Sequence, residues 1–253
     1  MFYIYTVIML IALLAVRHIL QLIKNYKKKQ KGEKGERIVH NILASLPKRK
    51  YKVIDNVLIK VNQRTTQIDH IVVSRYGVFV IETKNYKGMI KGSEDSEYWI
   101  QALSGQKNFF YNPIKQNLTH CKAILKYTKQ YDKLPVVSII AFSKECNLQV
   151  TSETEVVKFS KLNKTIRSYR RKRLSKKTML SVYERIVNDN MTKRRDHRQH
   201  IHSVKANVKS YERNIKKNVC PRCGKRLITR NMNHKRILRC KDKRHCGFVY
   251  YAA

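Results

Sequence analysis

The stretch Gln67–Lys84, QIDHIVVSRYGVFVIETK, decides the fold that this sequence predicts. Apolar and β-branched residues fill 67–74 and 78–84, and Gly77 lies in the short turn between them. This pattern is typical of a β-hairpin. We therefore expect two paired antiparallel strands here, and the polar residues inside them need an explanation.

Three charged residues lie inside these strands. Asp69 is in the first, while Glu82 and Lys84 are two positions apart and project from one face of the second. Two carboxylates that share a space repel each other unless a cation lies between them. Their oxygens suit Mg²⁺ or Mn²⁺, and a nearby lysine can orient water or stabilise charge on phosphorus. The alternative is a solvated strand face on which Glu82 and Lys84 form an ion pair.

The charge of the chain points to a polyanionic partner. Its 253 residues include 55 Lys and Arg against 17 Asp and Glu, a net charge of +38. Nucleic acid and an anionic membrane surface are the partners that such an excess favours. The alternative is a lysine-rich composition that only solvates the surface. Because acids are scarce, those inside apolar strands are stronger candidates for a functional site.

The N-terminal segment predicts a membrane anchor. Phe2–Val16 is apolar apart from Thr6, and the apolar character continues to Ile23, which is long enough to span a bilayer. The basic stretch KNYKKKQKGEKGER follows, so the positive-inside rule places everything from Lys24 onward in the cytoplasm. A cleaved signal peptide would have its charge before the apolar run, and a buried core helix would have a polar face. We therefore expect residues 1–24 to form a single-pass anchor in the cell membrane.

Residues 32–46 show helical spacing of apolar residues, and Pro47 ends the pattern. Glu36 lies at the edge of the apolar face, from which its carboxylate could reach the sheet. The alternative is a first-turn glutamate that interacts with the helix dipole.

The remaining core pattern alternates between strands and helices. Strands are expected at 51–59, 89–90, 98–102, 134–142 and 156–159, with a helix at 112–131 that Asn112 and Pro113 begin. Trp99 is expected in the core, and His120 is expected to be a packed or surface residue rather than a ligand. This order predicts an α/β or α+β sheet flanked by helices.

Four ordered motifs carry a resemblance. GEKGE (32–36), QIDHIVVS (67–74), GVFVIETKNYKG (77–88) and NPIKQN (112–117) resemble the nuclease-related domain family, which is similar to the restriction-endonuclease-like PD-(D/E)xK superfamily. The resemblance covers roughly residues 31–142. It implies an α/β mixed sheet flanked by helices and a Mg²⁺-dependent phosphodiesterase. The sequence departs from the superfamily name at one position, because Ile68 rather than proline precedes Asp69.

The resemblance also implies roles for particular residues. Glu36, Asp69 and Glu82 would be the acidic site residues, with Asp69 and Glu82 holding Mg²⁺ or Mn²⁺. Lys84 would be the catalytic lysine. Gln116 resembles a glutamine that hydrogen-bonds to phosphate or to a site carboxylate.

Residues 161–217 form a basic connector. Ser175 is expected to cap a helix whose apolar face, at Met179, Val182 and Ile186, docks on the core. After Asn188 the apolar periodicity fades, which indicates a flexible or loosely helical linker that follows phosphates without sequence preference. The alternative is a solvated spacer.

Residues 218–253 carry four of the six cysteines, as Cys220-x₂-Cys223 and Cys240-x₅-Cys246. Four thiolates in two close pairs suit tetrahedral Zn²⁺ in a reducing compartment and argue against a disulfide framework. His234 and His245 are less favoured substitutes. The segment looks like the zinc ribbon at the C-terminal end of bacterial type IA topoisomerases, and that resemblance implies binding of single-stranded DNA.

These observations predict four parts: an anchor (1–24), a nuclease-related domain (25–160), a basic helical linker (161–217) and a zinc ribbon (218–253). The expected function is a membrane-anchored, Mg²⁺-dependent nuclease that hydrolyses DNA, while its linker and ribbon bind the nucleic acid. The alternative is a catalytically inactive, membrane-tethered scaffold that binds nucleic acid.

Overall fold

The computed structural model describes residues 2–131, 133–232, 235–242 and 245–251. The fold is mixed α/β, as the sequence predicts, with the hairpin as its centre. Its helices are α1 (Phe2–Ala44), α2 (Pro113–Tyr127), α3 (Leu162–Ser168, after the short 3₁₀ turn Phe159–Lys161), α4 (Lys176–Asn188) and α5 (Arg194–Lys216). Its first nine strands are β1 (Tyr51–Val61), β2 (Arg64–Ser74), β3 (Gly77–Lys84), β4 (Gly88–Ser93), β5 (Tyr98–Leu103), β6 (Gln106–Tyr111), β7 (Val136–Phe142), β8 (Cys146–Thr151) and β9 (Glu155–Lys158).

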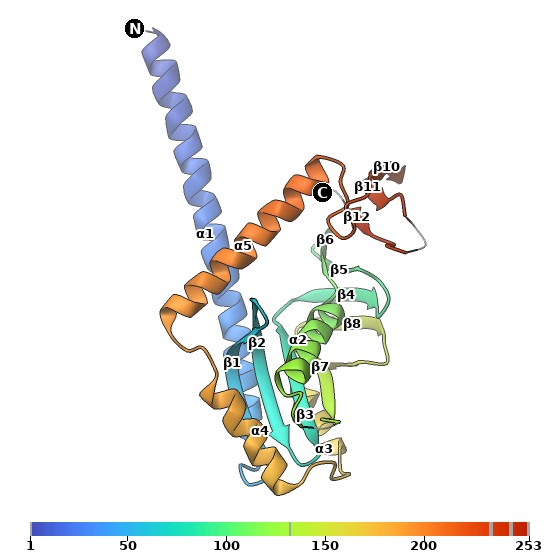
Figure 1. Ribbon diagram of the computed structural model, residues 1–253. Coiled ribbons are helices and arrows are strands. Elements are labelled where there is room, and N and C mark those ends of the chain that lie inside the picture. Colours follow the sequence, from blue (N-terminus) through green and yellow to red (C-terminus); the bar gives the residue numbers. More distant parts are fainter. Residues whose placement is uncertain (1, 132, 233–234, 243–244, 252–253) are drawn as a thin grey trace.

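The main sheet has the order β1-β2-β3-β7-β9. The first three strands are antiparallel neighbours, whereas β3, β7 and β9 run parallel. α2 and α4 cover one face of this sheet, and α3 and the C-terminal part of α1 cover the other (Figure 1). The central strands are buried on both faces, so β3 and β7 are almost continuously apolar.

A second sheet, with the order β6-β5-β4-β8, packs at the end of the main sheet. Its core is Trp99, which is fully buried as expected and stacks on Phe142 with ring centroids 6.1 Å apart. Gly92 lies under the indole, where an added Cβ would come within 2.4 Å of the ring. The strands β6 and β8 were not among those that the sequence predicts.

Two helix starts confirm the predicted caps. The Asn112 side chain accepts a hydrogen bond from the backbone N–H of Ile114, and the Ser175 side chain accepts one from Thr178. Three N–H···O bonds from the Asn112 amide to the β4–β5 loop, at 2.7–3.2 Å, also fix the start of α2 to the second sheet. The position of α2 is therefore set from its first residue.

α1 is one unbroken helix that joins the predicted anchor to the predicted 32–46 helix. Its N-terminal part projects beyond the sheets (Figure 1) and has exposed apolar side chains throughout. A window of 18 residues in it has a mean hydropathy of 2.2 and is 0% buried, so by length and composition this helix could cross a membrane.

The basic connector after Asn188 is regular rather than loose, because 23 of its residues form α5. Three short strands follow it: β10 (Leu227–Met232), β11 (Lys235–Cys240) and β12 (Val249–Tyr251). Their small core includes Leu227, Leu238 and Phe248 and packs against Ile215 near the end of α5.

Candidate functional site

The candidate site begins where β2 and β3 separate. The two strands pair from Ser74↔Gly77 to His70↔Ile81, and extending this register by one residue sets Asp69 level with Glu82. Beyond that point the backbone hydrogen bonds between β2 and β3 end. The Asp69 side chain takes their place, because the backbone N–H of Thr83 donates to Asp69 Oδ2 at 2.8 Å. The carboxylate is therefore held at an opening in the hydrogen-bonded sheet.

The irregularity extends to β1. Asn56 would face Asp69, but it has a φ of +51° and is absent from the otherwise continuous β1–β2 register. The side chains of β1 change face here, because Ile54 and Val57 contribute to the same apolar cluster although they are three residues apart. A turn-favouring asparagine thus lets the strand bend beside the acidic residue.

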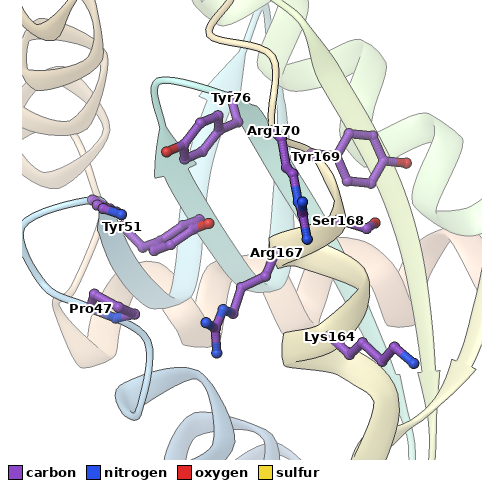
Figure 2. Close-up of a pocket in the computed structure, with 9 residues that line it drawn as sticks. Pro47, Tyr51, Tyr76, Lys164, Arg167, Ser168, Tyr169 and Arg170 are labelled. Atoms are coloured by element: carbon purple, nitrogen blue, oxygen red, sulfur yellow. The ribbon is translucent and has the colours of Figure 1, made fainter.

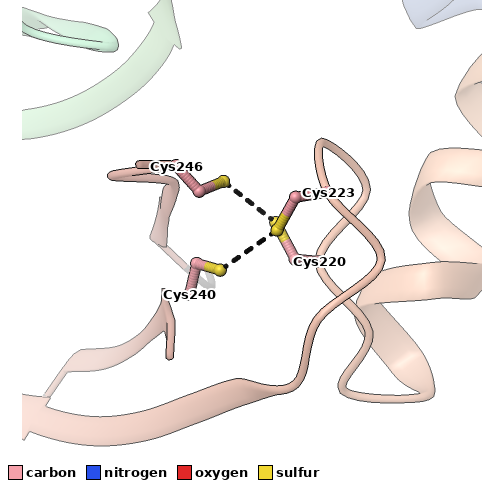
Figure 3. Close-up of side chains that lie close together, drawn as sticks. All are labelled: Cys220, Cys223, Cys240 and Cys246. Atoms are coloured by element: carbon pink, nitrogen blue, oxygen red, sulfur yellow. Dashed lines mark hydrogen bonds between the residues drawn. The ribbon is translucent and has the colours of Figure 1, made fainter. Parts of the chain in front are cut away.

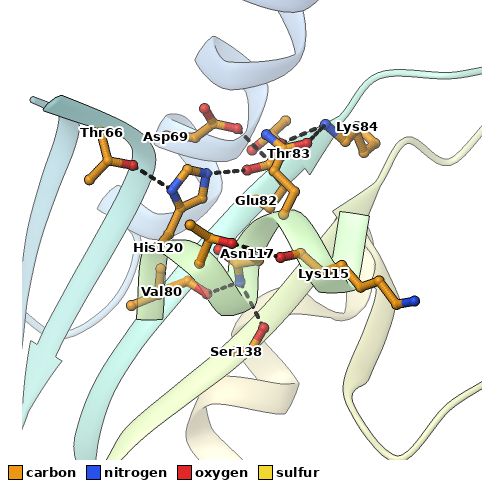
Figure 4. A network of polar contacts seen from close by, with 12 residues as sticks. Thr66, Asp69, Val80, Glu82, Thr83, Lys84, Lys115, Asn117, His120 and Ser138 are labelled. Atoms are coloured by element: carbon orange, nitrogen blue, oxygen red, sulfur yellow. Dashed lines mark hydrogen bonds and ion pairs between the residues drawn. The ribbon is translucent and has the colours of Figure 1, made fainter. Parts of the chain in front are cut away.

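Glu82 is the centre of the polar network. It is only 3% exposed, and the Lys84 ammonium donates to its Oε1 at 2.6 Å (Figure 4). His120 approaches the other carboxylate oxygen, with Nε2 3.4 Å from Oε2, while its Nδ1 contacts the Thr66 hydroxyl at 2.8 Å. One buried carboxylate is therefore held between a lysine from its own strand and a histidine from α2.

α2 supplies the rest of the network. Gln116 Oε1 accepts a second hydrogen bond from Lys84 at 3.1 Å, so Gln116 contacts the lysine and not a site carboxylate. Asn117 is fully buried and donates to Val80 O and Ser138 Oγ, both at 2.8 Å, which ties the helix to β3 and β7. The side chain of Lys84 is therefore fixed from two sides.

The pKa values of these groups move apart. Burial and repulsion by Glu82 raise the pKa of Asp69 well above its ordinary value, although the Thr83 N–H opposes them. Burial raises the pKa of Glu82 as well, but Lys84 and His120 outweigh it and the net pKa is lowered. Burial lowers the pKa of Lys84, whereas Glu82 raises it and prevails. The pair thus combines an ionised Glu82 with an Asp69 that holds its proton more tightly.

Glu36 lies on α1, near enough to interact electrostatically with Glu82 and Lys84. Burial raises its pKa, His70 lowers it, and Glu33 and Glu82 raise it further. The helix comes close here because of Gly35, where an added Cβ would lie 2.5 Å from the Cβ of Asn85, just after the end of β3. The structure records no hydrogen bond or ion pair of Glu36 with a described residue, so it is near the acidic pair without direct contact.

A cleft of about 490 Å³ opens beside Lys84, between α1 and the second sheet. Lys28, Lys31, Tyr86 and Phe110 are among its lining residues. The Lys31 ammonium lies 5.9 Å from the centre of the Tyr86 ring. A neighbouring groove of about 720 Å³ continues along α1 and adds basic side chains, namely Lys27, Lys34, Arg37 and Lys87. Glu33 and Glu145 also line the groove, and Glu145 pairs with Lys87. The cleft and the groove together still carry an excess of basic side chains beside Lys84.

His120 is the site residue that sequence reasoning missed. It was expected to be a packed or surface histidine, and it is 9% exposed, but it packs against Glu82. The available signal was its spacing, because His120 follows Gln116 by four residues and so lies on the same face of α2.

The four C-terminal cysteines converge as their spacing predicts (Figure 3). None of the four is in a disulfide, and their sulfur atoms lie within 4.8 Å of one another. The Cys220–Cys246 and Cys223–Cys240 sulfur distances are 3.6 and 3.4 Å, close to the roughly 3.8 Å that a tetrahedral zinc site with Zn–S bonds of about 2.3 Å requires. The donor set therefore fits a zinc ion.

Of the two alternative histidine ligands, the structure describes His245, which does not join this cluster. His245 is 84% exposed and its Nδ1 contacts Asp242 at 3.2 Å, whereas His234 lies outside the described residues. Within the described part of the chain, the cysteines are the one group of three or more such ligands within 4.8 Å; the acids Glu36, Asp69 and Glu82 do not form a second.

Comparison with known proteins identifies the core. The sequence pattern of the nuclease-related domain matches residues 31–143. An uncharacterised protein of Bacillus anthracis is 36% identical over 170 residues, which cover 65% of this chain and 79% of that relative. No solved structure matches the chain. The acidic site at Asp69, Glu82 and Lys84 lies inside the matched region. The chain belongs to the nuclease-related domain family.

Proposed function

We propose that this protein is a membrane-anchored, metal-dependent nuclease that hydrolyses phosphodiester bonds of DNA. The observation that carries the proposal is the buried Glu82–Lys84–Gln116 network beside Asp69, inside a nuclease-related domain. The mixed sheet with acids on neighbouring strands also suits a restriction-endonuclease-like core, which we propose for residues 25–160.

The carboxylates fit a divalent cation. Asp69 and Glu82 offer hard oxygen ligands. Burial, and after it repulsion by Glu82, raises the pKa of Asp69, and a cation between the two carboxylates would favour their ionised forms. Oxygen ligands with room for water are those that Mg²⁺ or Mn²⁺ prefers. When bound, such an ion acidifies a water molecule and offsets the charge that develops on the phosphate.

Individual side chains of the site have separate roles in the proposed reaction. Lys84 orients the attacking water and stabilises the developing negative charge, because Gln116 and Glu82 hold its ammonium in place. His120 fixes the orientation of Glu82 from the opposite side. Glu36, whose pKa is raised, is suited to take up a proton at the edge of the site or to tune the charge around the metal.

Nucleic acid reaches the site along the basic face of α1. The lysines of the two grooves provide contacts to phosphates that do not depend on sequence. Tyr86, Phe109 and Phe110 line the cleft and offer surfaces on which bases can stack. This arrangement favours a substrate that is at least partly unpaired.

We propose a structural Zn²⁺ on the four cysteines and a zinc ribbon that contacts the same substrate. The ribbon is not free of the core, because Arg222 makes two hydrogen bonds of 2.9 Å to the Glu97 carboxylate and Tyr211 on α5 contacts the Tyr98 hydroxyl at 3.0 Å. α5 and the ribbon thus extend the basic surface at a set position.

The apolar part of α1 would anchor the protein in the cell membrane. The lysines that follow it place the nuclease-related domain in the cytoplasm under the positive-inside rule. Access to intracellular DNA follows from this orientation.

The test is a cleavage assay on the full chain in detergent micelles. Mg²⁺ is compared with EDTA, and Lys84→Ala with the wild type. Loss of one group that stabilises the transition state lowers turnover by about 10²–10³-fold. Lys126→Ala, an exposed lysine on α2, serves as the control and keeps full turnover.

Binding without cleavage by any variant would favour the inactive scaffold instead. Cleavage that survives EDTA or Lys84→Ala would refute the roles assigned here.

A further inference from the structure

A second basic hollow lies beside the β2–β3 turn, at the opposite end of β3 from Glu82 and Lys84. Figure 2 shows it from close by. It has a volume of about 710 Å³ and lies between the α1–β1 connection, the β2–β3 turn and the end of α3. Its lining residues are Pro47, Lys50, Tyr51, Tyr76, Lys164, Arg167, Ser168, Tyr169 and Arg170. We call this cavity the tyrosine–arginine hollow.

The hollow is built for an anion. Four of its lining side chains are cationic: Lys50, Lys164, Arg167 and Arg170. No acidic side chain lines it among the described residues, although the Tyr169 hydroxyl donates to Glu155 Oε1 at 3.4 Å. Two guanidinium groups in one cavity suit the oxygens of a phosphate, which they can bind in pairs.

The opposite wall is aromatic. Tyr51 is only 6% exposed, and its ring lies 5.9 Å from that of Tyr76 at an interplanar angle of 37°. Burial raises the pKa of Tyr51, and the charge of Arg167 opposes this, which places the guanidinium near the phenol. Figure 2 shows both rings facing the space into which Arg167 and Arg170 extend. An aromatic face beside cations suits a planar base attached to a phosphate.

The backbone that follows the cationic wall is fixed to the β2–β3 turn. The segment after Arg170 returns to the β2–β3 turn, where the N–H groups of Arg173 and Leu174 donate to Arg75 O at 2.8 and 3.0 Å. The Arg75 side chain donates in turn to Leu174 O at 3.3 Å. Because this backbone is fixed, the exposed Arg167 and Arg170 side chains extend from an ordered support, which reduces the entropy lost on binding.

The position of the hollow restricts its ligand. β2 continues for five residues from Asp69 to Ser74, just before the turn that carries Tyr76, so the hollow is about 17 Å from the acidic site along β2. Pro47 lies beyond the end of α1, more than 20 helical residues past Ile23, or over about 30 Å from the apolar segment. A lipid headgroup of the anchoring membrane would therefore be out of reach, and the ligand must come from solution.

We propose that the tyrosine–arginine hollow binds a nucleotide, with its phosphate on Arg167 and Arg170 and its base against Tyr51 and Tyr76. The ligand is either the 5′-phosphorylated end of a nucleic acid or a free nucleotide. This binding does not require the acidic site, so it goes beyond the proposed nuclease activity and can be tested without it.

The experiment measures binding to the full chain in micelles, with EDTA present so that cleavage does not interfere. The probes are a fluorescent single-stranded oligonucleotide with a 5′-phosphate, the same oligonucleotide with a 5′-hydroxyl, and AMP and inorganic phosphate as competitors. The double variant Arg167→Ala/Arg170→Ala is compared with Arg171→Ala/Lys172→Ala, which removes two charges from neighbouring exposed positions outside the hollow. Thermal unfolding, followed by the fluorescence of Trp99, checks that both variants fold.

For a nucleic-acid end, we expect about tenfold tighter binding of the 5′-phosphate probe, and loss of that preference only in the Arg167/Arg170 variant. If the ligand is a free nucleotide, we expect the wild type to bind AMP and to bind the two oligonucleotides equally well. The Arg167/Arg170 variant should then lose AMP binding. Equal loss in both double variants would overturn the proposal, because general charge would then explain the binding. The proposal would also be overturned if the wild type neither bound AMP nor preferred the 5′-phosphate probe. It would likewise be overturned if the Arg167/Arg170 variant kept AMP binding and the 5′-phosphate preference unchanged.

Discussion

Replacing Asp69 by asparagine tests the repulsion at the centre of the site. Asn has nearly the same shape, and its amide oxygen can still accept the hydrogen bond from the Thr83 N–H. The change therefore removes the negative charge and little else. We expect the variant to unfold at a higher temperature than the wild type in EDTA, although it should lose nuclease activity.

The magnitude follows from the register. Directly opposed side chains on antiparallel strands have Cβ atoms about 5 Å apart, and two unit charges at that distance repel by about 3 kcal/mol at an effective dielectric constant near 20. The ammonium of Lys84, 2.6 Å from Glu82, offsets part of this. A net gain of about 1–2 kcal/mol would raise the melting temperature by about 2–8 °C for a chain of this size.

The assay uses the fluorescence of Trp99, the single tryptophan of the chain, which is fully buried. The full chain is heated in micelles with EDTA or with Mg²⁺. Mg²⁺ at a hundredfold excess over its Kd should stabilise the wild type by about 2.7 kcal/mol, and Asp69→Asn by much less. The difference in melting temperature between Asp69→Asn and the wild type should therefore shrink or change sign when Mg²⁺ is added.

The pH dependence has a definite sign. Because the pKa of Asp69 is raised in the folded state, its unfavourable contribution is absent below its unfolded pKa, grows as the pH rises from the unfolded to the folded pKa, and is complete above the folded pKa. The advantage of Asp69→Asn should therefore disappear in acid. A variant that is no more stable than the wild type at neutral pH in EDTA would refute the repulsion between Asp69 and Glu82.

Asp55 provides a matched control of opposite sign. Burial raises its pKa, but hydrogen bonds with His70 and His40, both 2.6 Å long, outweigh this and lower it. Its contribution to stability is present above its unfolded pKa and lost as the pH falls through its folded pKa. Asp55→Asn should therefore destabilise the fold by about 1–3 kcal/mol.

Three further changes test other parts of the structure. His120→Ala removes a neighbour that lowers the pKa of Glu82, so the acid limb of the pH–rate profile should move to higher pH; an unchanged profile would contradict this contact. Cys240→Ser should lower the zinc content of the purified protein from one equivalent to none, whereas Cys121→Ser, which is outside the cluster, should leave it intact. Ser175→Ala should cost about 1 kcal/mol of unfolding free energy, and Ser175→Asp, which keeps a capping oxygen, should cost much less.

The hairpin was predictable because its evidence is local. Alternating side chains place Asp69 and Glu82 on paired strands, and a turn glycine fixes which residues face each other. The start of α2 at Asn112 and of α4 at Ser175 followed from capping chemistry in the same way. Such features depend on residues a few positions apart, and the sequence displays them directly.

The features that the sequence did not predict depend on contacts between segments that are far apart in the chain. β6, QKNFFY, carries polar residues on an exposed edge and so lacks a strand pattern, yet it pairs fully with β5. His120 gains its partner, Glu82, only when α2 packs on β3. α5 is polar on most of its surface, and it is a regular helix whose end packs on the cysteine-bearing strands. No single-segment pattern reports these associations.

The continuity of α1 has a consequence for where cutting can occur. Glu36 and the apolar segment that ends at Ile23 belong to one helix without a break, so about 20 Å of rigid rod separates them. If the apolar segment lies in a bilayer, the helix holds the acidic site at a nearly constant distance from the lipid surface. If the proposed function holds, only nucleic acid within about two nanometres of the membrane would be cleaved, and lengthening the helix by whole turns would raise that height in steps of about 5.4 Å.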